Sequence, residues 1–192
     1  MTDIGEIVIL QENLGWLKTQ FKRASLNWQQ SRPDCRYYGG VVKEICQKPG
    51  KLEPMIFDPL QKWLADYILS REGKIAFSGT NGLDFFIKSG LRTIYYFTEI
   101  ADFFSKNPQY LAPIPSPITQ ANLAQAQQST KMQKTYSDFI NTFSSKLIGC
   151  NKQLSFLFLD LSKTVKYLPE DLINMQNNLE QKCTSYRISQ LR

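Results

Sequence analysis

The sequence predicts an all-α fold, a bundle of about six or seven helices. Apolar residues recur at steps of three and four along almost every segment, which is the period of an amphipathic helix. No segment combines strict alternation with a tight turn, as a β-hairpin does. Helix-start and helix-stop signals also separate the periodic segments at ordinary loop lengths. The 192 residues suffice for one sizeable core.

The first quarter of the chain predicts a long helix and a short one. The long helix begins after Asp3, which is placed to cap it, and ends at Pro33. Its apolar stripe consists of Leu10, Leu14, Leu17, Phe21, Ala24 and Trp28. The short helix covers residues 40–47, and Pro49 and Gly50 end it. Its inner face consists of Val41, Val42 and Ile45.

Two further helices are predicted in the first half. Asp58 and Pro59 mark the start of one, because a carboxylate caps a helix and proline fits its first turn. Its inner face consists of Leu60, Leu64, Tyr67 and Ile68. Asn81 and Asp84 open the other, which ends before Pro108. Its stripe consists of Phe86, Ile87, Leu91, Ile94, Tyr95, Phe97, Ala101 and Phe104. Between the two helices, near residues 75–77, the pattern leaves open a short strand.

Residues 108–117 predict an extended connector, because prolines occupy positions 108, 113, 115 and 117. The Pro-x-x-Pro spacing of an SH3 ligand is missing, so we interpret the segment as a stiff surface connector. It divides the chain into two helical halves. We expect residues 1–107, which include the basic N-terminal patch, to pack with residues 118–192 as one domain.

The second half predicts helices on either side of Gly149. Residues 119–128 are polar and rich in alanine and glutamine. The stripe that follows consists of Met132, Tyr136, Phe139, Ile140, Phe143 and Leu147. Gly149 is expected to break or bend the chain before a stripe of Leu154, Leu157, Phe158, Leu161 and Val165. Pro169, Glu170 and Asp171 form the first turn of the last helix. Its inner face consists of Leu172, Ile173, Met175, Leu179, Cys183 and Tyr186.

The net charge of +6 lies entirely within residues 15–52, which we call the basic segment. This segment contains eight basic residues and two acidic residues, Asp34 and Glu44, whereas the rest of the chain has no net charge. The eight are Lys18, Lys22, Arg23, Arg32, Arg36, Lys43, Lys48 and Lys51. Aromatic residues interleave them. A concentrated basic patch with aromatic rings is typical of a surface that meets phosphate.

The first helix presents part of this charge. Lys22 and Arg23 fall opposite its apolar stripe, and Lys18 falls on the flank. Trp16 also falls off the stripe. Its ring is either a stacking platform beside a cation, as in proteins that bind single strands, or it packs against a neighbouring helix or a partner protein.

A turn at residues 31–40 carries further basic and aromatic residues of the basic segment. Arg32 and Arg36 carry guanidinium groups, which bind phosphate oxygens or stack on bases. Tyr37 and Tyr38 supply rings, and two glycines allow a close backbone approach. The alternative is a surface loop whose tyrosines fold back onto the core. The candidate nucleic-acid-binding residues are therefore the eight cations together with three rings, Trp16, Tyr37 and Tyr38.

The four cysteines, Cys35, Cys46, Cys150 and Cys183, include no Cys-x-x-Cys pair. We interpret them as small buried apolar residues. A disulfide between Cys35 and Cys46 fits only an oxidising compartment. We expect a cytoplasmic protein instead, because the start of the chain has no basic region before its apolar residues, as a signal peptide would. The absence of an Asn-x-Ser/Thr acceptor agrees with this expectation.

The absence of histidine removes the commonest general base and the triads built on it. Neither a phosphate-binding Walker loop nor a dinucleotide fingerprint occurs. Residues 79–82 have the Gly-x-x-Gly form of KH domains but lack the strands around it. Glu99 and Asp102 are spaced to hold a metal or to act in acid–base chemistry, yet the same spacing is typical of a solvated helix edge. We expect neither catalysis nor a cofactor nor a metal.

The resulting expectation is a non-enzymatic helical subunit of a nucleoprotein complex. It would bind the backbone of RNA or DNA without reading sequence, beside other protein subunits. In size, charge and helicity it is similar to small helical subunits of CRISPR effector complexes, an analogy that rests on those three properties. One alternative is a protein–protein adaptor or scaffold whose basic surface docks an acidic partner. Another is a peripheral membrane binder. No integral membrane association is expected, since no apolar run reaches the length of a span.

Overall fold

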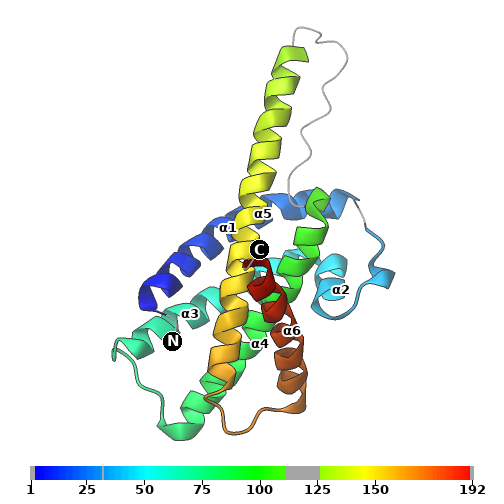
Figure 1. Cartoon of the computed structure of the whole chain (residues 1–192). Coiled ribbons are helices and arrows are strands. Elements are labelled where there is room, and N and C mark those ends of the chain that lie inside the picture. Colours follow the sequence, from blue (N-terminus) through cyan, green and yellow to red (C-terminus); the bar gives the residue numbers. More distant parts are fainter. Residues whose placement is uncertain (1–2, 32, 111–125, 191–192) are drawn as a thin grey trace.

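The computed structural model describes residues 3–31, 33–110 and 126–190, which form an all-α bundle as predicted (Figure 1). The helices in these ranges are α1 (Ile4–Ser31), α2 (Gly40–Gln47), α3 (Asp58–Arg71), α4 (Gly79–Lys106), α5 (Ala126–Ser162) and α6 (Glu170–Gln190). Short 3-10 turns and one π-helical segment join them: η1 (Cys35–Tyr37), η2 (Pro49–Lys51), η3 (Glu53–Phe57) and η4 (Pro108–Tyr110). No strand occurs in the described ranges, so a strand near residues 75–77 is ruled out.

α4 and α5 run side by side through the centre of the bundle (Figure 1). α1 and α3 pack together on one side of this pair, where α1 contacts α5 and α3 contacts α4. α6 lies on the other side against both central helices, and α2 packs against α4. The first turns of α5 extend beyond the other helices (Figure 1).

One hydrophobic cluster fills the space between the helices and includes residues from all six. The apolar stripe predicted for α1 lies in it: Leu10, Leu14, Leu17, Phe21 and Trp28 are each at most 2% exposed. The Phe21 ring lies 4.9–5.2 Å, centroid to centroid, from the rings of Phe57, Phe104 and Phe143. Because these partners lie on η3, α4 and α5, the aromatic contacts join both halves of the sequence.

The helix boundaries follow the local signals closely. α2 has the predicted bounds, and at the start of α1 the Gly5 N–H donates to the Asp3 carboxylate. α3 begins at Asp58, but that carboxylate forms an ion pair with Lys18 and caps no helix N–H. α4 begins at Gly79 rather than Asn81. Gly79–Gly82, the Gly-x-x-Gly motif, is therefore the first turn of a helix.

Two predictions for the second half are wrong. Gly149 does not break the helix, because α5 continues through it from Ala126 to Ser162. Glycine adopts helical dihedrals at a cost of roughly 1 kcal/mol relative to alanine, and the apolar face on both sides of it, which includes Leu147 and Leu154, is buried in the core. Ile173 is 41% exposed rather than inward.

Part of the prediction falls outside the described residues. Residues 111–117 of the connector, residues 119–125 of the polar stretch and Arg32 of the turn belong to that part. The side chains of Ala24, Met132 and Tyr136 also lie outside the description.

Candidate functional site

The basic segment runs through the second half of α1, η1, α2 and η2. Some of its cations are already paired within the chain: Lys18 with Asp58, Arg36 with Asp34, and Lys51 with Glu44. Among the described residues of the basic segment, the cations without an ion pair are Lys22, Arg23, Lys43 and Lys48. Exposed ion pairs contribute only about 0–1 kcal/mol to stability. A phosphate group that binds the lysine or arginine can therefore displace the carboxylate from such a pair.

The Arg36 guanidinium is held by its own turn. Its Nε lies 3.0 Å from Asp34 Oδ1, and its Nη2 lies 2.8 Å from Asp34 Oδ2. The Arg36 backbone N–H also donates to Asp34 Oδ1, at 3.1 Å, which caps η1. These hydrogen bonds raise the pKa of Arg36 and lower the pKa of Asp34. The side chain thus stabilises the turn and presents only its remaining N–H groups to a ligand.

The three candidate rings lie in different surroundings. Trp16 packs between α1 and α5, its ring centroid 5.8 Å from that of Phe143, with Lys146 Nζ 5.0 Å from the indole. The Tyr38 ring makes an edge contact with Phe103, at 4.9 Å between centroids. Tyr37 is 82% exposed. Of the three, Tyr37 alone presents its ring freely to solvent.

Three lysines of the basic segment come together on one surface. Lys43, Lys48 and Lys51 line a hollow of about 330 Å³ on α2 and η2, which we call the lysine hollow. The other lining residues are Gly40, Glu44 and Gln47. Glu44 is the acid among them, and its Oε1 lies 2.9 Å from Lys51 Nζ. The lining therefore has a surplus of positive charge.

The first turn of α2 is anchored by a carboxylate from α4. Gly39, the residue before α2, provides no side-chain cap, and the Val41 N–H donates instead to the Glu99 carboxylate. Gly40 has a φ of +58°, a left-handed conformation that favours glycine, and a Cβ there would lie 3.5 Å from Glu99 Oε2. Glu99 thus orients the helix that carries the lysine hollow.

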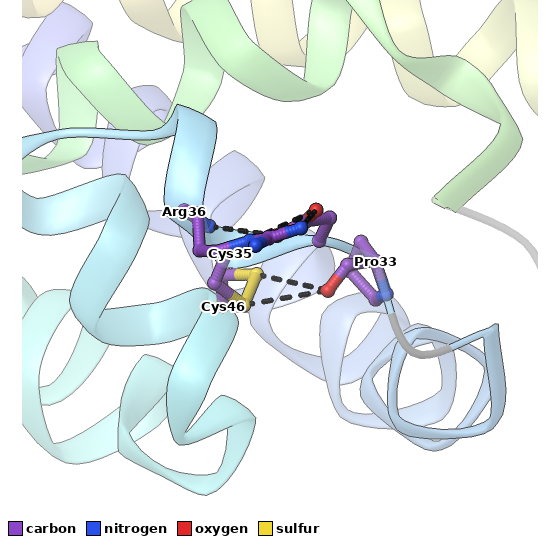
Figure 2. Close-up of a disulfide and its surroundings, with 5 residues drawn as sticks. Pro33, Cys35, Arg36 and Cys46 are labelled. Atoms are coloured by element: carbon purple, nitrogen blue, oxygen red, sulfur yellow. Dashed lines mark hydrogen bonds and ion pairs between the residues drawn. A yellow bond between two sulfur atoms is a disulfide. The ribbon is translucent and has the colours of Figure 1, made fainter.

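The last turn of α2 is anchored by a disulfide between Cys35 and Cys46 (Figure 2). Both sulfur atoms face the carbonyl oxygen of Pro33, at 3.5 Å from Cys35 Sγ and 3.9 Å from Cys46 Sγ (Figure 2). The interpretation of these two cysteines as separate apolar residues is therefore wrong. The turn at residues 33–39 folds the chain back and brings Cys35 beside α2, which the spacing alone did not reveal.

The other two cysteines agree with the interpretation. Cys150 and Cys183 are buried free thiols, and burial raises the pKa of Cys150 to about 12. A disulfide is typical of oxidising compartments, so the bond between Cys35 and Cys46 weighs against the expected cytoplasmic location, which stays a prediction. In the described helices, none is long and apolar enough to cross a membrane.

Glu99 and Asp102, the paired carboxylates of α4, both have structural partners. They line an open cavity of about 470 Å³ between α2, α4 and α6. Asp102 pairs with Lys182 and accepts a hydrogen bond from Asn151 Nδ2 at 2.9 Å. Asn151 Nδ2 also donates to Tyr186 Oη, whose pKa is raised to about 12, mainly by burial. Nowhere in the described ranges do three or more potential metal ligands gather.

Comparison with known proteins finds no counterpart: no family model, no curated protein and no solved structure matches the chain.

Proposed function

We propose that the chain is a non-enzymatic helical subunit that binds the phosphate backbone of a nucleic acid without reading its sequence. The observation that carries this proposal is the lysine hollow, where three ammonium groups face one acid. Phosphate oxygens accept hydrogen bonds from ammonium groups, and each phosphate neutralised releases counterions. The hollow lies on α2 and η2, and none of its lining residues belongs to the hydrophobic cluster.

Further exposed cations lie on α1. Lys22 and Arg23 are exposed on α1 and carry no ion pair within the described residues. Tyr37 offers an exposed ring beside Arg36. Trp16 and Tyr38 serve intramolecular packing, so the proposal assigns them no contact with the ligand. Charge therefore carries the binding, with at most one stacking group.

A second candidate function is an adaptor that docks an acidic protein segment. The lysine hollow already accommodates a carboxylate, since Glu44 binds Lys51 within it. A peripheral membrane binder is less well supported, because α1 buries the apolar stripe with which it would enter lipid.

The salt dependence of binding tests the leading proposal. We expect mixed-sequence oligonucleotides to bind, with the logarithm of affinity falling linearly with the logarithm of salt concentration. Four unpaired cations predict a slope of about −3 for single strands and about −3.5 for duplexes. The double variant Lys43→Gln/Lys48→Gln should bring the slope closer to zero by about 1.5. Fluorescence anisotropy over a salt series measures both.

Two further double variants complete the design. Lys22→Gln/Arg23→Gln changes the slope by the same amount if α1 joins the binding surface. Lys163→Gln/Lys166→Gln is the matched control, because it removes two exposed lysines between α5 and α6. Absence of binding at low salt, or equal losses in the control and in the lysine hollow, contradicts the proposal. Binding of polyglutamate without binding of oligonucleotides supports the adaptor.

A further inference from the structure

The disulfide lies within the surface that carries the lysine hollow. Cys46 is on the last turn of α2, between Lys43 and Lys48 in sequence. Cys35 is on η1, a turn in which no residue is fully buried. The covalent bond therefore ties an exposed turn to the helix that positions the lysines.

Other interactions also hold α2 in place. A helix of this length is not stable by itself in water, so its structure depends on tertiary contacts. Those contacts include the burial of Val41 and Ile45, the hydrogen bond to Glu99, the ion pair between Glu44 and Lys51, and the disulfide. Val41 and the hydrogen bond to Glu99 act on the first turn of α2, whereas Ile45 is buried in its second half. The disulfide acts on the end from which Lys48 and Lys51 continue.

Of the two residues in the disulfide, Cys35 is the more exposed. Cys35 is partly exposed, whereas Cys46 is 6% exposed. A thiolate of an external dithiol reaches Cys35 Sγ, forms a mixed disulfide and expels the Cys46 thiolate, which takes up a proton. The second thiol of the reductant then attacks the reductant sulfur that is bonded to Cys35, and Cys35 leaves as a thiolate that takes up a proton. Two protein thiols form, and the dithiol is oxidised to a disulfide.

We infer that the Cys35–Cys46 disulfide is a redox latch on the lysine hollow. The oxidised bond holds η1 against α2 and keeps Lys43, Lys48 and Lys51 around one hollow. Reduction by a dithiol frees η1, loosens the last turn of α2 with η2, and weakens binding of a polyanion. The binding part of this inference rests on the proposed function, whereas the conformational part does not.

Hydrogen exchange with mass spectrometry tests the latch on the full chain. Oxidised protein is compared with protein reduced by a dithiol and alkylated, and with the double variant Cys35→Ser/Cys46→Ser. We expect amides of residues 40–51 to exchange at least tenfold faster in both altered forms, while amides of α4 and α5 keep their rates. Oligonucleotide affinity at low salt should fall at least threefold. Cys183→Ser is the control, because that buried thiol lies outside the latch.

Each outcome decides one part. Unchanged exchange at residues 40–51 overturns the latch, as does a purified non-reduced chain with four alkylatable thiols. Faster exchange throughout α4 and α5 also overturns it and shows a general staple of stability. Faster local exchange with unchanged oligonucleotide affinity overturns the inference that the disulfide regulates binding. Faster local exchange in a chain that never binds oligonucleotides supports the latch and contradicts the proposed function.

Discussion

Among the glycines of the described residues, Gly90 on α4 leaves the least room for a Cβ, because Trp63 of α3 lies against it. Trp63 is buried, and its Nε1–H donates to the carbonyl oxygen of Phe86 at 2.9 Å. A Cβ added at Gly90 would lie 2.1 Å from Cε2 of the indole. Only glycine leaves room for this ring, so Gly90 sets how closely α3 approaches α4.

Gly90→Ala should therefore destabilise the protein, although alanine is the better helix former. We expect a loss of about 1–3 kcal/mol in the free energy of unfolding, because the indole must move out of its site. Gly149→Ala is the control, since nothing lies within 4 Å of a Cβ there. That variant should gain about 0.5–1 kcal/mol. Urea unfolding measures both, and equal effects of the two substitutions contradict this account.

At the scale of elements, α2 is the shortest α-helix of the described residues and depends on its neighbours. Glu99 is half-buried, and this burial is the main cause of its raised pKa. Hydrogen bonds from Tyr95 and from the Val41 N–H, together with the charge of Lys182, act in the opposite direction, while Asp102 adds to the increase. The carboxylate thus lies at a position where its charge is unfavourable, and it anchors the first turn of α2.

The pKa of Glu99 predicts a pH effect of definite sign. Because it is higher in the folded state, the stability contributed by Glu99 is fully present below its ordinary pKa of 4.5 and is lost as pH rises through the folded value. Glu99→Gln keeps an oxygen acceptor for the Val41 N–H but carries no charge. We expect this variant to gain stability relative to the wild type between pH 4.5 and pH 7.

Urea unfolding at several pH values measures the difference between the two chains. Glu99→Ala serves as the comparison, because it removes the acceptor together with the charge and should loosen α2. Parallel pH profiles of the wild type and Glu99→Gln would contradict the assignment.

At the scale of the whole molecule, the core joins elements that are far apart in sequence. Phe21 of α1 contacts Phe57, Phe104 and Phe143, which belong to three other elements. Residues from both sides of the connector belong to the same hydrophobic cluster. We therefore expect the described helices to unfold together in one transition.

Phe21→Ala should cost about 3–5 kcal/mol, because it removes a fully buried ring at the junction of four elements. Phe85→Ala is the matched control, since Phe85 is 75% exposed and its loss should change stability by less than about 0.5 kcal/mol. Tryptophan fluorescence and far-ultraviolet circular dichroism report the transition. Separate midpoints for the two signals in the wild type would contradict a single cooperative core.

The sequence predicts only part of the candidate site. The basic segment and its eight cations follow from counting charges. Their division into paired and unpaired cations does not, because Asp58 lies 40 positions from its partner Lys18. Likewise, the partners of Trp16 on α5 lie far along the chain, and no local pattern distinguishes a packed ring from a stacking platform.

The sequence by itself determined which segments are helical and where most of them begin and end. Periodicity, caps and prolines act between residues a few positions apart, so α2 and the start of α3 appear where they were predicted. The tertiary structure alone decided that Gly149 continues a helix, that Cys35 joins Cys46, and that three lysines share a hollow. Those outcomes depend on burial and on how neighbouring elements fold against one another, which local sequence patterns do not encode.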